Sequence, residues 1–586
     1  MKFKRTHTCG ELNKSHENQQ VVLQGWVDRR RDHGSLTFID LRDIYGKTQI
    51  VFDPSHSDAA AHVRELKTEY VISVVGRVRQ RPPGMVNPQL ATGEIEVVAD
   101  EYEILNPAKT PPFLIVDNVD ASEELRFKYR YLDLRRPEMQ RNMLIRHRTA
   151  QLVRQYLSSH GFFEIETPYL MRSTPEGARD YLVPSRIHKG KFYALPQSPQ
   201  TYKQILMVAG YDRYFQIVKC FRDEDLRADR QPEFTQIDLE LSFVDEEDIF
   251  RLAEGLMQHI FSAILDVHLP APFPILNYDE AISRYGTDKP DLRFDLSIKD
   301  ISQYVANCDF KVFSNVVASN GIVGGINLKG RAHYSRKQLD TLNQFVMDLG
   351  GKGVLFAKVT SDGWDSSIRK YLADGMVEQI NRSMQAEPGD LLLFMAGERK
   401  STLDLLGRLR VKLAADEGMI DEHQFCPLWV VNFPLLEYDN ESGRYVAMHH
   451  PFTTPRTDDL SLLDSDPGRV RARAYDLVMN GYEIAGGSIR NYQYDSQMKI
   501  FSLLKIDKAE AEEKFGFLLE ALQYGAPPHG GIAFGFDRLV MILAGRNSIR
   551  DVIPFPKTTS ALSLMDNSPS EVTPEQLKEL GLKLDI

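Results

Sequence analysis

The segment between Val218 and Glu240 constrains the fold most strongly, because two apolar stretches flank a loop that is crowded with charge. Residues 214–221 and 234–243 are rich in β-branched and aromatic residues, so each is predicted to form a strand. The loop between them carries arginines and acidic residues of both signs: Arg222, Arg227, Arg230, Asp223, Glu224, Asp225 and Asp229. A surface turn does not need so many charges. A site that binds a polyphosphate and a metal ion does need them.

The composition indicates a multidomain protein of a reducing compartment. The chain has 586 residues, which favours three or four domains. Its net charge of −11 argues against binding polyanions by bulk charge, although a local basic patch remains compatible with nucleic acid. The cysteines lack the paired spacing of disulfide frameworks or zinc sites: Cys9, Cys220, Cys308 and Cys426. No apolar run is long enough to span a membrane, and the N-terminus lacks the core of a signal peptide, so we expect a cytoplasmic protein.

The first hundred residues read as short strands, with a helix-like segment at 59–66 after the third strand. This order predicts the five-stranded barrel called the OB-fold, which binds single-stranded nucleic acid by stacking bases on aromatic rings among cations. Phe38, together with Arg29, Arg31 and Gln49, supplies that chemistry. The alternative is that Phe38 belongs to the core and that the arginines form a solvated turn.

A proline-rich hinge near 106–112 separates this barrel from a longer region of mixed structure. Residues 139–159 have the apolar periodicity of a helix, and 161–168 end that helix and begin a strand. Residues 192–203 run from a strand into a helix. Further on, 481–490 form a glycine-rich strand, and 530–543 give a strand, a glycine break and a helix that carries Arg538 near its start. Neither the dinucleotide-binding nor the P-loop fingerprint is found.

In this order, the segments resemble the motifs of class II aminoacyl-tRNA synthetases. Residues 161–168 resemble the first motif, a dimer element; 221–224 resemble the second, and 535–538 the third. The OB-fold barrel points to the aspartate/asparagine/lysine subgroup. Residues 173–180, 200–203 and 449–452 resemble those of bacterial-type aspartyl-tRNA synthetases.

The resemblance implies a multidomain α+β/β architecture with an antiparallel catalytic sheet. The implied parts are an anticodon-binding OB-fold domain (1–105), a hinge (106–135), a catalytic domain in two pieces (136–287 and 425–557), a bacterial-type α+β insertion (288–424) and a C-terminal extension (558–586). Within the insertion, Lys400 and residues 408–410 are interpreted as solvated charge rather than as RNA contacts.

The implied reaction is the activation of L-aspartate by ATP to aspartyl-adenylate, followed by transfer to the 3′ end of tRNA-Asp. Both steps need positioning and charge neutralisation rather than a protein nucleophile. Arg222 and Arg538 are the implied catalytic residues, since one guanidinium can serve two oxyanions. Glu224 would accept from the adenine amino group, and Phe234 would stack on the ring. The full implied ATP set is Arg222, Asp223, Glu224, Gln231, Phe234, Glu483, Gly535, Phe536, Asp537 and Arg538.

Three of these assignments have structural alternatives. Arg222 could form a surface ion pair with Asp223 or Glu224, and Phe234 could be a core aromatic. Arg538 could simply pair with Asp537, although the helix dipole disfavours an arginine at that end.

Two carboxylates, Asp476 and Glu483, are expected to hold Mg²⁺ together with water and phosphate oxygens. The alternative for Asp476 is a solvated carboxylate on a helix.

The implied aspartate site is Glu176, Ser198, Gln200, Lys203, Arg222, Asp238, His449 and Arg490. Lys203 and Arg490 would bind the side-chain carboxylate, and unpaired cations would disfavour the neutral amide of asparagine. His449 could instead be a structural histidine. Ala485 stands where the family commonly has a third glycine, and we expect little loss from this change.

Rival interpretations are another enzyme of this fold or a non-catalytic RNA-binding paralogue. Other enzymes of this fold include an asparaginyl- or lysyl-tRNA synthetase. They also include an ammonia-dependent asparagine synthetase, but that enzyme lacks the N-terminal barrel and the long insertion.

The anticodon-binding residues are expected to be Arg29, Arg31, His33, Phe38, Gln49 and Gly84. His33 and Gly84 resemble the relaxed members that also charge tRNA-Asn. A homodimer is implied by the first motif.

Overall fold

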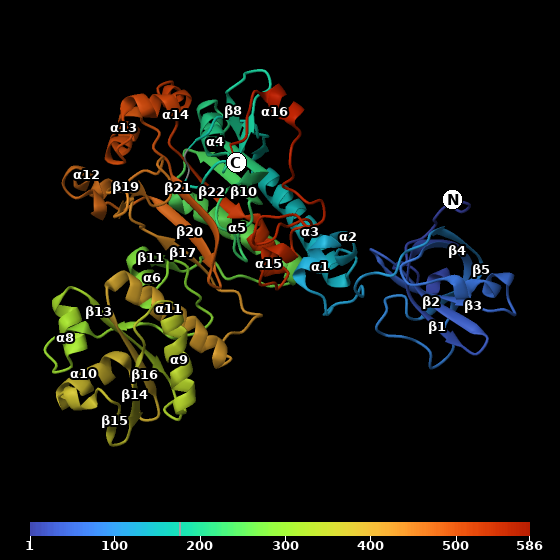
Figure 1. Ribbon diagram of the computed structural model, residues 1–586, viewed down its shortest axis with the longest axis horizontal. Helices are drawn as coiled ribbons and strands as arrows, with labels where there is room; N and C mark the ends of the chain where they lie inside the picture. The colour runs from blue at the N-terminus through green and yellow to red at the C-terminus, as the bar shows by residue number, and fades with distance from the viewer. Residues whose placement is uncertain (175–176, 586) are drawn as a thin grey trace. The chain divides into compact units, whose positions relative to one another are not determined.

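The computed structural model describes residues 1–174 and 177–585 (Figure 1). The chain divides into two compact units. The first contains Met1–Met143 and Leu562–Ser568, and the second contains Leu144–Ala561 and Pro569–Ile586. Within the described residues, no helix has the length and apolarity that a membrane crossing requires. All four cysteines are free thiols.

The first unit contains the predicted five-stranded closed barrel. Its strands follow the order β1-β2-β3-β5-β4, in which β3 and β5 are parallel. Alternate residues of the first strand, such as Val21, Leu23 and Val27, point into the barrel core. The strands are β1 (Gln20–His33), β2 (Leu36–Asp43), β3 (Gly46–Phe52), β4 (Val71–Gln80) and β5 (Ile95–Asn106).

The helix-like segment at 59–66 is not an α-helix, which corrects the sequence prediction. It forms two short 3-10 turns, η2 (Asp58–Ala61) and η3 (Val63–Glu65), that meet at His62. An isolated stretch this short gains too few hydrogen bonds to offset the cost of helix nucleation. The other 3-10 turns of the described chain are η1 (Lys14–His16), η4 (Arg369–Tyr371), η5 (Thr457–Asp459), η6 (Pro467–Arg469) and η7 (Ile549–Asp551).

An eight-stranded sheet forms the centre of the second unit, in the order β11-β17-β20-β21-β22-β10-β9-β6. The two strands predicted around the charged loop are its neighbours β9 and β10, paired antiparallel. Only the outermost pairs, β11 with β17 and β6 with β9, are parallel. The strands are β6 (Phe163–Glu164), β9 (Arg213–Phe221), β10 (Glu233–Ser242), β11 (Ile275–Asn277), β17 (Pro427–Val431), β20 (Ala474–Met479), β21 (Tyr482–Ile489) and β22 (His529–Gly535).

Helices α5 and α15 pack against this sheet and bury its main apolar core (Figure 1). Two small hairpins lie outside the sheet: β7 (Leu182–Pro184) with β8 (Phe192–Ala194), and β18 (Leu436–Asp439) with β19 (Arg444–Ala447). The helices outside the inserted region are α1 (Glu123–Lys128), α2 (Arg130–Asp133), α3 (Pro137–Ser159), α4 (Gln200–Val208), α5 (Glu246–Leu265), α6 (Tyr278–Tyr285), α12 (Leu462–Ser465), α13 (Tyr494–Leu503), α14 (Lys508–Leu522), α15 (Phe536–Leu543) and α16 (Pro574–Leu580).

Between α6 and β17 the chain forms a second, five-stranded sheet in the order β12-β13-β16-β14-β15. Its strands are β12 (Lys299–Asp300), β13 (Ile322–Leu328), β14 (Leu355–Thr360), β15 (Gly363–Asp365) and β16 (Leu391–Gly397). Its helices are α7 (Ser302–Val305), α8 (Lys311–Ala318), α9 (Arg336–Asp348), α10 (Asp374–Met384) and α11 (Arg399–Asp416).

Arg410 of α11 is buried, so the interpretation of residues 408–410 as solvated charge is wrong for this side chain. Its guanidinium lies 4.0 Å from the ring centre of Phe294 and 4.9 Å from that of Tyr285. It donates to the carbonyl oxygens of Asp291, Phe294 and Leu296. Burial lowers the pKa of Arg410 to about 10. Arg410 therefore fastens α11 to the end of α6, where the chain leaves the central sheet.

Candidate active site

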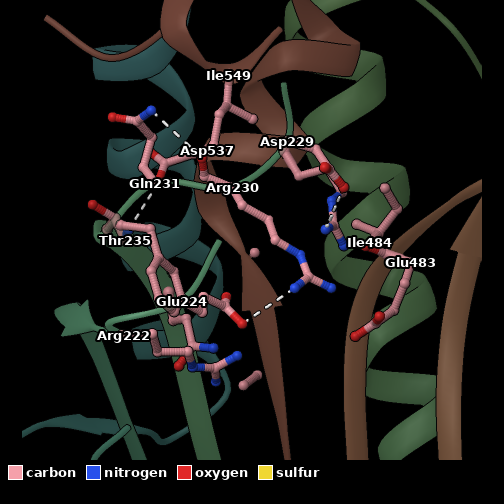
Figure 2. Close-up of a pocket in the computed structure, with 15 residues that line it drawn as sticks. Arg222, Glu224, Asp229, Arg230, Gln231, Thr235, Glu483, Ile484, Asp537 and Ile549 are labelled. Carbon is pink, nitrogen blue, oxygen red and sulfur yellow. Dashed lines mark hydrogen bonds and ion pairs between the residues drawn. The ribbon is translucent and has the colours of Figure 1, made fainter. Parts of the chain in front are cut away.

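A cavity opens beside the charged loop, between β10, β21 and the start of α15 (Figure 2). The loop brings Arg222 and Glu224 to one side, and β21 brings Glu483 to the opposite side. Segments about 250 to 310 positions apart in the chain thus share one site, because β10 and β21 both pair with β22. The lining residues are Arg222, Glu224, Asp229, Arg230, Gln231, Phe234, Thr235, Gln236, Glu483, Ile484, Ala533, Gly535, Asp537, Arg538 and Ile549.

Arg222 has its side chain available for a ligand. Its guanidinium lies 5.1 Å from the ring centre of Phe234, and it forms no ion pair with any described residue. The alternative of a surface pair with Asp223 or Glu224 is therefore wrong for the described chain. Phe234 is partly exposed and lies outside the apolar core clusters, so it is not a plain core aromatic. The two side chains form a cationic and aromatic wall of the cavity.

Two acidic residues of the loop, Glu224 and Asp229, are paired with arginines at the cavity. Glu224 accepts a hydrogen bond from Arg230 at 3.2 Å. Arg538 donates to Asp229 at 3.2 Å and to the backbone carbonyl of Glu483 (Figure 2). The alternative in which Arg538 pairs with Asp537 is wrong, because the carboxylate of Asp537 has other partners.

Asp537 lines the cavity, but its carboxylate accepts hydrogen bonds from other residues of the protein. It is buried, and it accepts from Arg146 at 2.5 Å and from the backbone N–H of Thr235 at 2.7 Å. Its neighbour Phe536 lies in the main core and does not line the cavity. These bonds fix the start of α15 against β10 and so position Arg538.

Two further members of the expected ATP set also have structural roles. Gln231 lines the cavity, but its amide exchanges hydrogen bonds with the backbone of Lys557, at 3.0 and 2.8 Å. Asp223 does not line the cavity; its backbone N–H donates to the carbonyl of Arg179 at 3.0 Å. Gly535 lines the cavity as expected.

The two carboxylates expected to hold a metal ion lie on neighbouring strands. Asp476 is a buried residue of β20, so the alternative of a solvated helix carboxylate is wrong. A Cβ added to Gly486 would lie 2.8 Å from Oδ1 of Asp476 and 3.3 Å from Oε1 of Glu483, which explains the glycine between them. Oδ1 of Asp476 has no hydrogen-bond partner within the described chain. Burial, followed by Glu483 and Asp288, raises the pKa of Asp476 well above its usual range.

This arrangement fits a hard cation that keeps other oxygen ligands. Carboxylate oxygens suit Mg²⁺, which is usually held by one or two protein carboxylates together with waters and phosphates. The described residues contain no group of three or more His, Cys, Asp or Glu side chains that would hold a metal ion unaided. Waters or the phosphates of a nucleotide would complete the coordination.

A cluster of buried charged residues lies beside the cavity. The pairing of its cations removes the expected reason for selecting aspartate over asparagine. Lys203 of α4 bonds to Asp238 and lies 3.2 Å from Glu240, while Arg490 donates to Glu240 at 3.0 Å. The two cations are therefore paired, and the argument that they would stay uncompensated against an amide substrate does not hold. Oδ2 of Asp238 has no hydrogen-bond partner within the described chain.

Glu240 was not among the expected site residues. It is fully buried, and its Cα position is two residues from Asp238 on β10, so both side chains point to the same face. Two buried cations need carboxylates nearby. Because side chains alternate between the two faces of β10, Glu240 could have been identified from its spacing to Asp238. Burial raises the pKa of Asp238, whereas Arg490 and Lys203 hold the pKa of Glu240 below its usual value.

The remaining expected residues lie around this cluster. Gln200 is buried and donates to Gln204 at 3.1 Å, and its backbone N–H lies 3.4 Å from Oγ of Ser198. His449 packs edge-on against Phe433 with its ring centre 4.3 Å away, and its Nδ1 lies 3.8 Å from Asp476. Burial lowers the pKa of His449. Glu176 lies outside the described residues.

His450 lies in the segment 449–452, but no role was expected for it. Its Nε2 is buried without a hydrogen-bond partner in the described chain. Burial lowers the pKa of His450 well below its usual value, and the nearby charges of Arg490, Lys203 and Arg222 add to this effect.

Two glycines of the central strands cannot carry a side chain. A Cβ on Gly487 would meet the carbonyl oxygen of Gly531 at 2.1 Å, and one on Gly531 would meet Glu240 at 1.9 Å. The methyl of Ala485, by contrast, is accommodated in the main core.

The residues expected to bind the anticodon lie on the barrel of the first unit. Arg29 and His33 are exposed on β1, and Phe38 of β2 is partly exposed and outside the barrel core, so the core alternative is wrong. Arg31, whose Cα pairs with that of Phe38, donates to Gln49 at 3.2 Å and to Asp40 at 2.7 Å. Gln49 is buried and donates to Glu96 at 2.7 Å. Gly84 has a φ of 81°, in open space.

Comparisons with known proteins agree with both parts of this picture. Residues 122–559 match the family described as tRNA synthetases class II (D, K and N), and residues 21–105 match the OB-fold nucleic acid binding domain. The chain is 55% identical over 584 residues to the aspartate–tRNA(Asp/Asn) ligase of Desulfatibacillum aliphaticivorans, covering 99% of this chain and 98% of that protein. It is 56% identical over 579 residues to the enzyme of the same name from Moorella thermoacetica, covering 99% and 96%.

Among solved structures, the asparaginyl-tRNA synthetase of Pyrococcus horikoshii in complex with asparaginyl-adenylate is similar in fold. The TM-score is 0.59 at 19% identity, and the match covers 95% of this chain and 98% of that one. The family match over most of the chain, the matched barrel and the full-length relatives give one conclusion: this chain belongs to the class II tRNA synthetase family of the aspartate, lysine and asparagine enzymes.

Proposed function

We propose that the protein is an aspartate–tRNA ligase that activates L-aspartate with ATP and transfers it to the 3′ end of tRNA-Asp and tRNA-Asn. The observation that carries this proposal is one cavity in which Arg222, without a carboxylate partner among the described residues, lies opposite Glu483. The buried Asp476 is on the strand next to Glu483, and a buried charge cluster lies nearby. The full-length relatives that bear the name aspartate–tRNA(Asp/Asn) ligase support the choice of amino acid and of tRNAs.

In the activation step, the α-carboxylate of aspartate attacks the α-phosphate of ATP and pyrophosphate leaves. Arg222 faces the cavity with its donors available, so it would bridge the attacking carboxylate and the α-phosphate. Phe234 would stack on the adenine ring, and Glu224 would accept from its amino group. Arg538, held by Asp229 and the start of α15, would neutralise the far phosphates.

Aspartate selection is proposed to depend on the hydrogen-bond donors and acceptors of the charge cluster that are not used within the cluster. The hydrogen bonds of Arg490 to Glu240 and Ser488 use three of its five N–H groups, so two remain for a substrate carboxylate. Oδ2 of Asp238 is a ready acceptor for the substrate ammonium. Gln200, Ser198, His449 and Glu176 are proposed to complete the site.

Mg²⁺ is proposed to bind between Asp476 and Glu483, where it would neutralise phosphate charge. Replacing Asp476 with asparagine removes one charged ligand and relieves the repulsion between the carboxylates. We therefore expect millimolar Mg²⁺ with ATP to raise the melting temperature of the wild type clearly more than that of Asp476→Asn. Calorimetry without aspartate measures this directly. Equal metal-dependent stabilisation of both proteins would contradict the assignment.

The barrel is proposed to bind the anticodon, with Phe38 as a stacking platform beside Arg29, Arg31, His33, Gln49 and Gly84. Base stacking on an aromatic side chain contributes about 1–3 kcal/mol. Phe38→Ala should therefore raise the KM for tRNA about 5- to 150-fold, while aspartate-dependent pyrophosphate exchange stays unchanged. Loss of exchange in this variant would mean that the substitution disturbs the second unit.

Charging of both tRNAs is tested by aspartylation of purified tRNA-Asp and tRNA-Asn transcripts, followed by gel separation of the charged and uncharged species. The proposal expects both to be aspartylated. Product with tRNA-Asp alone would restrict the enzyme to one tRNA, and asparaginylation of tRNA-Asn would favour the asparaginyl rival.

We further propose a cytoplasmic homodimer. The free cysteines are compatible with a reducing compartment. Phe163 on β6, at the edge of the central sheet, and the nearby Tyr211 are 60% and 45% exposed, and an unpaired edge with apolar side chains favours a partner. Sedimentation velocity measures the mass directly.

A further inference from the structure

The hairpin formed by β7 and β8 carries charge of one sign only. Residues 182–194 contain Arg186, His188, Lys189 and Lys191 and no acidic residue, in a chain whose net charge is −11. Lys189 and Lys191 are exposed and form no ion pair with any described residue. The loop is well defined, because Ser185 accepts from the backbone N–H of His188 at 3.1 Å and donates its own N–H to the carbonyl of Lys191 at 2.9 Å.

Aromatic rings lie among these cations. Phe192 and Tyr193 are 44% and 39% exposed, although both belong to a strand. Together with Tyr202 of α4 they line a groove whose other walls are Leu170, Met171, Arg172, Ser185, His188 and Lys191. Exposed aromatic rings beside unpaired cations are the chemistry that binds single-stranded nucleic acid.

Backbone pairing connects the chain beside the groove to the active-site strands. Ala194 pairs with Met171, and the backbone N–H of Phe221, which precedes Arg222, donates to the carbonyl of Pro196 at 2.9 Å. Tyr193 is three residues from Pro196, about 10 Å of extended chain at roughly 3.3 Å per residue. A strand bound in the groove would thus end near the cavity that contains Arg222.

We infer that this face, the β7–β8 hairpin with Tyr202, binds the unpaired 3′ end of the RNA substrate on its way to the cavity. The inference rests on the proposed function for the identity of that RNA. Phosphates would lie against Lys189, Lys191 and Arg172, and bases would stack on Phe192 and Tyr193. A second copy of the chain is a poorer occupant, because two such faces meeting about a two-fold axis would oppose like charges.

The C-terminal helix α16 forms one flank of this face (Figure 1). A Cβ on Gly581 would lie 3.4 Å from Cδ of Lys189, and Arg186 lies 3.8 Å from Glu579, with both side chains more than 60% exposed. The C-terminal extension therefore lies beside the stem of Lys189, a residue that is exposed.

The test compares two pairs of charge reversals in the full-length protein. Lys189→Glu with Lys191→Glu changes the hairpin, and Lys337→Glu with Lys352→Glu makes the same charge change at exposed positions without a described ion pair in the inserted region. The probes are fluorescein-labelled RNA minihelices with and without four unpaired 3′ nucleotides, measured by anisotropy. A third variant, Phe192→Leu with Tyr193→Leu, keeps apolar bulk and removes the rings.

The wild type should bind the tailed minihelix more tightly than the blunt one. The hairpin reversal should weaken binding of the tailed probe at least 10-fold and remove the difference, the leucine variant should weaken it about 5-fold or more, and the control pair should change little. Equal loss in both charge reversals would assign the effect to bulk charge and overturn the inference, as would a change of mass in sedimentation velocity, which would assign the face to a second copy. Aspartate-dependent exchange by the wild type, measured without RNA, decides the proposed function separately.

Discussion

Replacing Arg222 with alanine is expected to lower the rate of aspartate-dependent ATP–pyrophosphate exchange by at least about 10²- to 10³-fold. The guanidinium lies in the cavity against Phe234 without a described carboxylate partner, so its charge is available to a transition state. In-line attack on the α-phosphate builds negative charge, and Arg222 is the loop arginine that lines the cavity without a described carboxylate partner. The loss should appear mainly in kcat, since charge that develops in the transition state is what the residue stabilises.

Arg227 provides the matched control for this variant. It belongs to the same loop and is exposed, but it does not line the cavity. Arg227→Ala should retain exchange within about three-fold, and both variants should bind tRNA as the wild type does, because the barrel is unchanged. Comparable losses in the two variants would show that the loop needs its net charge and not Arg222 itself.

Replacing Arg490 with leucine is expected to affect both catalysis and folding. The residue is buried and donates to Glu240 and Ser488, so its removal leaves the buried carboxylate of Glu240 with Lys203 alone. Breaking a buried ion pair by removing one partner costs about 3–5 kcal/mol. Exchange should become undetectable at millimolar aspartate, because the variant also lacks the two N–H groups proposed for the substrate carboxylate.

Arg473→Leu is the control for these effects, because it removes a different, more exposed ion pair. Arg473 bonds to Glu246 with 28% of its side chain exposed, on the segment that leads into β20. Its removal should cost about 1 kcal/mol or less and leave the KM for aspartate unchanged. Denaturant unfolding and exchange kinetics of both variants check the prediction. If Arg490→Leu were as stable and as active as Arg473→Leu, the buried cluster would have no role in aspartate binding.

Local sequence patterns predicted the framework of the site. The apolar stretches around the charged loop form β9 and β10, and the glycine-rich strand and the segment before Arg538 form β21 and β22. These elements have strong periodicity and clear turn signals, so their identity does not depend on distant partners.

The partners of the charged side chains could not be predicted in the same way. Asp537 precedes Arg538 in the chain, yet it bonds to Arg146, and Gln231 bonds to the backbone of Lys557. Such pairs join segments hundreds of residues apart and depend on how the helices pack on the sheet. Glu240 is different, because the alternation of β10 places it beside Asp238 and so indicates a second buried carboxylate.

The most direct measurement of the central claim is ATP–pyrophosphate exchange by the purified wild-type protein without tRNA, with aspartate or asparagine as the only amino acid. The arrangement of Arg222, Asp238 and Arg490 predicts rapid exchange with aspartate and at least about 100-fold slower exchange with asparagine at equal concentration. Exchange supported by asparagine as well as by aspartate, or no exchange with either, would contradict the assignment of this site to aspartate activation.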